Sequence, residues 1–240
     1  MISFILPYIF DREEQLLVNL RSLDNQTSND WEIILVCHNE LNPASAINWG
    51  VENARGEIIC LTSPEVVNAS TNVEEMLLLP PRTYWVGWCI ETFTSDLPEN
   101  SKDWTKENFK QLAPVKATVS AHCTEVDWAP WKYFLAVLHK DDWLPMGECF
   151  TDGIGWEDFN WSKDMLRSRI KVEFNPEIVG IHLWHSREYQ VQNSHLLKRN
   201  LIHYWWRQSK YEWCRWYLGE KKRAVSRCLS KIAKIRLGPS

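Results

Sequence analysis

Short apolar runs alternate with amphipathic segments along the first 62 residues of this 240-residue chain. Three of these runs have the length of buried strands: residues 2–7 (ISFILP), 31–37 (WEIILVC) and 57–62 (EIICLT). The two segments between them, residues 12–26 and 42–56, carry helical signals, either apolar residues at helical spacing or a capping residue followed by a terminating glycine. This order predicts parallel strands joined by right-handed crossover helices, a Rossmann-like α/β half.

The pattern changes after residue 66, where mixed elements are expected. Further elements are predicted as helices at 72–79 and 156–169, strands at 83–93 and 131–140, the latter entering a short helix, and a strand, proline turn and strand within 171–185. We therefore expect one α/β domain over residues 1–190 and a helical, basic extension over residues 191–240.

The extension concentrates positive charge. Residues 198–240 hold twelve of the 27 Lys and Arg residues and two of the 31 acids, although the net charge of the whole chain is −4. Residues 221–236 place their apolar side chains on one helical stripe, which fits either a helix packed on the domain or an interfacial helix on anionic lipid. Packing on the domain and peripheral membrane contact through 221–236 are therefore both expected as alternatives. Nucleic acid is not, because the acidic remainder would repel a phosphate backbone.

No stretch of the sequence resembles a secretory leader or a membrane span. Residues 1–14 lack a basic segment and contain a proline, and no run approaches the roughly 18 apolar residues of a span. The seven cysteines are scattered singly without a C-x-x-C pair, which favours free thiols in a reducing compartment. These features predict a cytoplasmic protein.

Candidate ligand-binding residues follow the three N-terminal strands. Ligands of open α/β sheets bind beyond the carboxyl ends of the strands, which here are Pro7-Tyr8, Cys37-His38-Asn39-Glu40 and Thr62-Ser63-Pro64-Glu65. The sequence contains neither G-x-G-x-x-G nor G-x-x-x-x-G-K-[ST], so a dinucleotide fingerprint or a P-loop is not expected.

Glu65 follows a buried strand on a proline turn. It is either a solvated loop acid or a hard oxygen ligand for Mg²⁺ or Mn²⁺ bound to a diphosphate. His182 and His185, in HLWH, are the other candidate ligands, although either alone is more often structural. On a strand, residues three apart face opposite sides, so at most one of the two would join such a site.

The stretch GWEDFNW (155–161) places Glu157 and Asp158 between large aromatic rings. Acidic residues are favourable in the first turn of a helix, and the pattern fits such a helix start. It fits equally a site in which one carboxylate is a general base and the other binds a substrate hydroxyl. Neighbouring tryptophans would then wall a sugar site, although core filling is their commoner role.

Five segments, taken in order, resemble family 2-type glycosyltransferases of the GT-A fold over residues 1–187. They are ISFILPYIFDREEQLLVNLRSL, WEIILVC, NWGVENARGEIICLTSPEV, GWEDFNW and FNPEIVGIHLWH. The more specific motifs are A-x-G-E before the third strand, and W-E-D followed by a strand and H-x-x-H. The resemblance implies a GT-A nucleotide-diphospho-sugar transferase fold and a nucleotide-sugar donor. It also implies Mn²⁺ or Mg²⁺ as cofactor and a glycan or lipid-linked acceptor.

The resemblance also implies residue roles. Asp158 matches the catalytic base, and Glu157 with Trp156 the acceptor contacts. The remaining matched positions are Pro7, Tyr8, His38, Asn39, Ser63 and Glu65 for the donor, and Glu65 with His182, or His185 in its place, for the metal. Two departures stand out. Ser63 replaces the first acid of the family's D-x-D motif, and CHNE replaces the usual aspartate after the second strand.

The resemblance implies an inverting displacement in which Asp158 takes the acceptor proton. The alternative is a non-catalytic nucleotide- or sugar-binding protein that kept the GT-A fold, which the missing first acid favours and the intact W-E-D disfavours. A nucleotidyltransferase is a third class, but those enzymes typically carry a Gly-rich loop after the first strand, and PYIFDREE has none.

Overall fold

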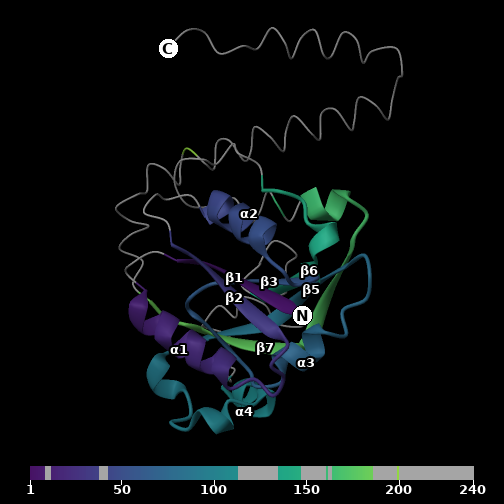
Figure 1. The fold of residues 1–240 in the computed structure, drawn as a ribbon. Coiled ribbons are helices and arrows are strands. Elements are labelled where there is room, and N and C mark those ends of the chain that lie inside the picture. The colour runs from purple at the N-terminus through teal and green to yellow at the C-terminus, as the bar shows by residue number, and fades with distance from the viewer. Residues whose placement is uncertain are drawn as a thin grey trace, which may run out of the picture.

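The computed structural model describes residues 1–8, 12–37, 43–112, 135–146, 161, 164–185 and 199. In chain order its helices and strands are β1 (Ile2–Tyr8), α1 (Glu13–Asp24), β2 (Trp31–Cys37), α2 (Pro43–Asn53), β3 (Ile58–Thr62), β4 (Val66–Asn68), α3 (Asn72–Met76), β5 (Thr83–Thr92), α4 (Lys106–Gln111), β6 (Leu135–His139) and β7 (Lys171–Leu183). Helix α2 covers one face of the sheet and α1 and α3 lie on the other side (Figure 1), while α4 packs through Phe109 against Val179 and Ile181 of β7.

The sheet has seven strands in the order β2-β1-β3-β6-β5-β7-β4. Strand β1 pairs in parallel with β2 and β3, as the sequence predicted. Strand β6 runs antiparallel to both β3 and β5, and β7 is parallel to β5. The carboxyl ends of β1, β2, β3, β5 and β7 therefore lie at one edge of the sheet. Strand β4, antiparallel to β7, begins at that edge.

Strand β7 corrects the prediction of two strands separated by a proline turn. Residues 171–175 and 179–183 both pair with β5, and the register shifts between Gly87 and Trp88. Pro176 lies in the short interruption between the two paired stretches, where no backbone N–H is needed for a hydrogen bond to β5. One strand with an irregularity therefore accommodates the proline.

Two other predictions fall partly or wholly outside the described residues. Of the helix predicted at 156–169, residues 161 and 164–169 are described: Trp161 and residues 164–167 are helical, and residues 168–169 form a turn. Of the extension at 191–240, only Arg199 is described. None of the helices in the described part of the chain is long and apolar enough to cross a bilayer.

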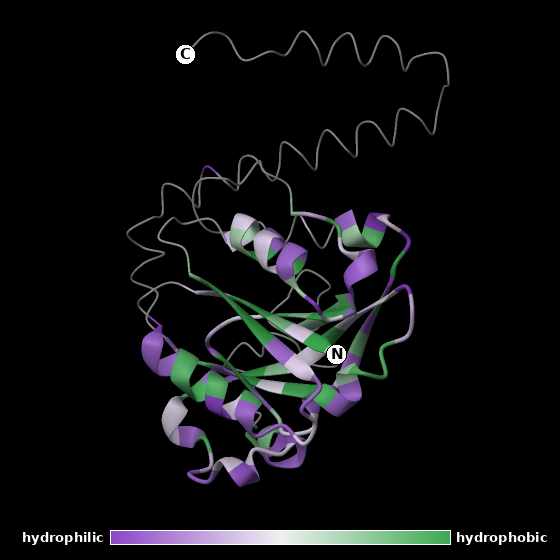
Figure 2. Ribbon diagram, in the orientation of Figure 1, coloured by the Kyte–Doolittle hydropathy of each residue, from purple (hydrophilic) through white to green (hydrophobic). Residues whose placement is uncertain are grey.

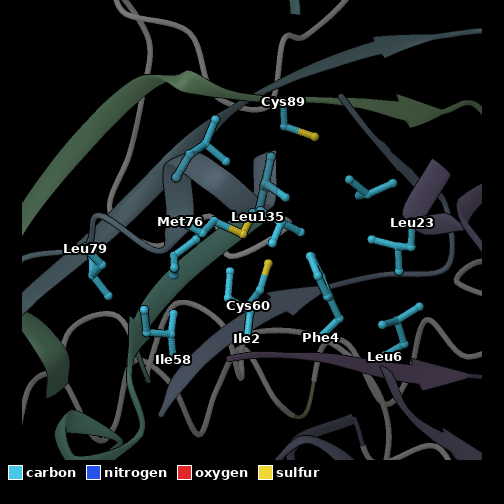
Figure 3. Packing of buried hydrophobic residues seen from close by; sticks show 14 of the residues in the cluster. Ile2, Phe4, Leu6, Leu23, Ile58, Cys60, Met76, Leu79, Cys89 and Leu135 are labelled. Carbon is cyan, nitrogen blue, oxygen red and sulfur yellow. The ribbon is translucent and has the colours of Figure 1, made fainter. Parts of the chain in front are cut away.

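Apolar side chains fill both sides of the sheet. On one side Leu23 of α1 and Met76 of α3 pack with Phe4 and Cys60 of the central strands (Figure 3). On the other side α2 packs with β1, β3 and β6, and Trp161 belongs to this cluster. Figure 2 shows the matching colours, with mostly hydrophobic strands and helices whose hydrophilic residues lie outward. Burial of this kind supplies the main stabilisation of the sheet.

The A-x-G-E motif joins β1, β2 and the end of α2. The Gly56 N–H donates to Ser3 Oγ at 2.9 Å, and that hydroxyl donates to Glu32 Oε1 at 2.7 Å. A Cβ on Gly56 would lie 2.6 Å from Ser3 Oγ and 2.8 Å from the Met1 carbonyl oxygen, so only glycine fits. The backbone N–H and the Nε of Arg55 both donate to the Glu32 carboxylate, each at 2.7 Å.

Glu32→Gln is expected to lower the free energy of unfolding at neutral pH and to make that free energy less dependent on pH in the acid range. Desolvation alone would raise the Glu32 pKa, but hydrogen bonds from Ser3 and Arg55 outweigh it and lower the pKa to about 2. Because this lies below the unfolded value of about 4.3, the stabilisation is complete above that value and is lost as the pH falls towards 2. Urea unfolding at a series of pH values measures this. The exposed Glu57→Gln is the control, and an unchanged pH dependence in Glu32→Gln would contradict the expectation.

Candidate active site

The structure brings Glu65 and the two histidines of HLWH to the same edge of the sheet. The Leu183 N–H donates to the Glu65 carbonyl oxygen at 2.8 Å, and Val66 lies opposite His182 in the β4–β7 ladder. These segments are far apart in sequence, and they meet because β4 returns antiparallel beside the carboxyl end of β7. The predicted pairing of Glu65 with His182 as neighbours is thus consistent with the fold.

Helix α1 holds the turn that carries Glu65. The Asn19 Nδ2 donates to the carbonyl oxygens of Ser63 and Val66, and Ser22 Oγ accepts from the Asn68 N–H at 2.9 Å. Asn19 and Ser22 are fully buried, so these contacts are shielded from water. The Ser63–Asn68 segment is therefore anchored to α1 at several points along its length.

Arg12, at the N-cap of α1, forms an ion pair with Glu65. Its Nε donates to Glu65 Oε1 at 2.8 Å, and both side chains are only 10% exposed. A buried guanidinium–carboxylate hydrogen bond is much stronger than a solvated surface pair. Glu65 is therefore not a solvated loop acid, which was one of the two interpretations of its sequence position.

Both histidines reach the neighbourhood of Glu65. His185 Nε2 lies 3.8 Å from Glu65 Oε1, and the rings of His182 and His185 are 5.5 Å apart. The alternation of strand side chains, the reason for expecting at most one of them at the site, does not extend to His185, because strand β7 ends at Leu183.

Two charged residues of this edge were missed by sequence reasoning. Arg12 follows the first strand in FDREE, and Glu91 lies near the end of β5 in WCIETF. Glu91 is paired with His182 in the β5–β7 ladder and is 9% exposed, so the two residues share a face of the sheet. The signal that could have found both is a charged residue at the carboxyl end of a buried strand.

The other predicted donor contacts lie at the same edge. Tyr8 ends β1, is 7% exposed and belongs to the core cluster under α1, while Pro7 is half-buried. Thr62 ends β3 and Ser63 follows it, and the hydroxyl oxygens of both are buried without a hydrogen-bond partner among the described residues. Such buried hydroxyls are uncommon and call for an explanation.

The described residues do not form a preassembled metal centre. Within them, no group of three or more His, Cys, Asp or Glu side chains is placed to hold an ion. Glu65 is the one carboxylate of the TSPEV segment, and its Oε1 already accepts from Arg12. Five predicted site residues lie outside the described residues: His38, Asn39, Trp156, Glu157 and Asp158.

No protein family and no curated protein matches this sequence, but solved structures match its fold. Residues 1–349 of S. aureus TarS superpose with a TM-score of 0.52 at 12% identity, covering 76% of this chain and 60% of that one. The same fragment in complex with UDP gives 0.50 at 9% identity, covering 75% and 60%. GalNAc-T7 with UDP, GalNAc and Mn²⁺ gives 0.52 at 12% identity, covering 78% and 44%.

This chain spans less than two thirds of the length of each of these matched chains. At such identities the likeness concerns the fold. TarS and GalNAc-T7 are GT-A glycosyltransferases, and the match covers about three quarters of the present chain. The seven-stranded mixed sheet described above is thus the sheet of the GT-A glycosyltransferase fold, and this chain has that fold.

Proposed function

We propose that the chain is a glycosyltransferase that moves a sugar from a nucleotide-diphosphate sugar to an acceptor hydroxyl. One observation carries this proposal: in a GT-A fold, Glu65 of TSPEV and the histidines of HLWH lie together at the carboxyl edge of the sheet. Ligands of open α/β sheets bind at that edge. Two structures with this fold contain UDP, namely TarS and GalNAc-T7.

The donor diphosphate suits the polar groups at this edge. Ser63, next to the turn that carries Glu65, is proposed as a donor contact on its sequence position, since its hydroxyl is buried in the structure. The Arg12 guanidinium, next to Glu65, adds positive charge at the same place. Pro7, Tyr8, His38 and Asn39 are proposed to contact the base and ribose, on their sequence positions.

Mn²⁺ or Mg²⁺ would be held by Glu65 and His182, with His185 in place of His182 as the alternative. Carboxylate and imidazole are ligands that Mn²⁺ accepts, and the oxygens of the donor diphosphate would complete the set. When bound, the ion would neutralise the charge of the departing nucleoside diphosphate. Because Arg12 already pairs with Glu65, we expect the ion to bind appreciably only together with the donor.

The acceptor half of the proposal rests on GWEDFNW. Asp158 is assigned the role of general base, and Glu157 and Trp156 the role of acceptor contacts. Direct attack of the acceptor oxygen at the anomeric carbon would invert the configuration there. A cytoplasmic enzyme with a basic, amphipathic segment at 221–236 would suit a lipid-linked acceptor at a membrane surface.

A non-catalytic nucleotide- or sugar-binding protein is the second candidate. The Arg12–Glu65 ion pair favours it, because a carboxylate that accepts from a guanidinium is a weaker metal ligand. The two candidates differ in turnover: both bind a nucleotide sugar, and only the enzyme releases nucleoside diphosphate in the presence of an acceptor.

At least one UDP-, GDP-, dTDP- or CMP-sugar is expected to raise the melting temperature, and Mn²⁺ should increase the shift. A ligand at 100 times its Kd stabilises by about 2.7 kcal/mol, which is several degrees for a domain of this size. Glu65→Ala should lose the Mn²⁺-dependent part of the shift, whereas the exposed Glu99→Ala should keep it. No shift with any of these sugars would contradict the proposed function. Shifts and turnover that are unchanged in EDTA would contradict the metal assignment alone.

A further inference from the structure

We propose that Phe93 and Trp184 form a stacking platform for a pyranose ring of the acceptor glycan, at the rim of the candidate active site. The two rings are 55% and 52% exposed, and their centroids lie 5.8 Å apart with an interplanar angle of 38°. Phe93 follows β5 and Trp184 follows β7, and neither is part of any role assigned above. That the bound glycan is an acceptor rests on the proposed function, whereas the platform itself rests on the geometry.

The platform continues the face of the sheet that carries Glu91 and His182. Glu91 lies opposite His182 in the β5–β7 ladder, and Thr92 lies opposite Leu183. Phe93 is extended, with φ −89° and ψ 152°, and the Trp184 N–H donates to the Thr92 carbonyl oxygen at 2.7 Å. The alternation of side chains therefore persists, so Phe93 and Trp184 point to the same side as Glu91 and His182, about 7 Å further along the strands.

The chain beyond the strand end holds this aromatic pair in place. The Asp96 carboxylate accepts from the Thr92 hydroxyl at 2.6 Å and from the Phe93 N–H at 3.2 Å. The Asp96 N–H in turn donates to the Phe93 carbonyl oxygen at 3.0 Å. The first two hydrogen bonds also hold the pKa of Asp96 below its ordinary range, so this carboxylate stays ionised. The platform is consequently preorganised, which lowers the cost of binding to it.

A pyranose is the ligand that this arrangement fits best. Exposed aromatic rings next to polar groups bind molecules that have one apolar face and a hydroxyl-bearing edge, as a pyranose does. The buried Glu91 carboxylate and the two imidazoles lie inward of the rings and would contact hydroxyls of the next sugar unit. A ring stacked on Phe93 and Trp184 would thus direct the end of an acceptor glycan towards the site.

Fluorine NMR of the full chain labelled with 5-fluorotryptophan tests the platform. The probes are cellobiose, lactose and N,N′-diacetylchitobiose, and sorbitol serves as a polyol without a ring face. The Trp184 resonance, assigned by its loss in Trp184→Phe, is expected to move saturably with at least one disaccharide. Trp49 on α2, 53% exposed, is the matched control and should stay in place. Phe93→Ser should weaken this binding about tenfold, equivalent to about 1.4 kcal/mol of stacking.

Three results would overturn the platform: no response of Trp184 to any of the disaccharides, an equal response to sorbitol, or an equal response of Trp49. Unchanged affinity in a Phe93→Ser variant that melts like the unmodified chain would remove Phe93 from it. The thermal-shift screen with nucleotide sugars, run on the same protein, reports on the proposed function separately. Binding of a disaccharide without binding of any nucleotide sugar supports the platform and contradicts the transferase.

Discussion

Asp158→Asn is expected to lose sugar transfer by a factor of about 10²–10⁴ while binding the nucleotide sugar with unchanged affinity. The amide has the shape of the carboxylate but cannot take the proton of the acceptor hydroxyl. The loss should therefore appear in kcat, because the proposed role of Asp158 concerns the acceptor and not the donor. Release of nucleoside diphosphate in the presence of acceptor measures the first quantity, and the thermal shift with the donor alone measures the second.

Asp164→Asn is the matched control for this substitution. Asp164 belongs to the same stretch of chain and pairs with Arg167, Oδ1 to Nη1 at 3.3 Å, an i,i+3 contact between side chains that are 20% and 29% exposed. Its variant should transfer at close to the normal rate. Near-normal turnover in Asp158→Asn would remove that residue from the mechanism. Equal losses in the two variants would indicate a structural effect of this segment instead.

The parallel part of the fold could be predicted from local sequence. Residues 2–7, 31–37 and 57–62 are mostly apolar, as expected for strands of a parallel sheet, and α1 and α2 lie within the two segments that carry helical signals. Gly56 shows the same agreement at atomic scale, since a Cβ there would collide with Ser3 Oγ. The strands and helices depend on neighbours close in sequence or on burial, whereas the need for glycine at position 56 comes from its contact with Ser3 on β1.

The mixed part of the sheet could not be predicted in this way. Nothing in the apolar run of β6 states that it inserts antiparallel between β3 and β5, because strand pairing depends on residues far away in the chain. The same limit applied to Pro176, which suggested a turn where the strand only shifts register. It applied also to His185, whose direction is decided by the end of β7 rather than by its spacing from His182.

The candidate site shows the same difference between features that local sequence predicts and features that depend on long-range contacts. Ser63 and Glu65 were proposed as site residues because ligands bind after strand ends, a rule that needs only local sequence. Arg12 was missed because its importance lies in one long-range contact with Glu65. Because of that contact, Glu65 is one half of a buried ion pair and not a carboxylate that is open to a metal. Replacing Arg12 and Glu65 together is the best way to separate the role of this ion pair in ligand binding from its effect on folding.

Arg12→Met is expected to destabilise the protein by about 3–5 kcal/mol, because it leaves the Glu65 carboxylate buried without its cation. The double variant Arg12→Met/Glu65→Gln should recover most of that loss, since replacing both members of a buried pair is often close to neutral. Urea unfolding measures both free energies. Lys171→Met is the control, because Lys171 and Glu173 form an exposed pair and its loss should cost well under about 1 kcal/mol.

Donor binding is expected to stay weak in the double variant even where stability returns. Stability needs only that no charge is left buried alone, whereas a diphosphate needs the guanidinium itself and any metal ion needs the carboxylate. The thermal shift with the nucleotide sugar found in the screen measures this second quantity. A double variant that regains both stability and donor binding would show the ion pair to be a structural support only. One that stays as unstable as Arg12→Met would show that the buried charge of Glu65 is not the source of the loss.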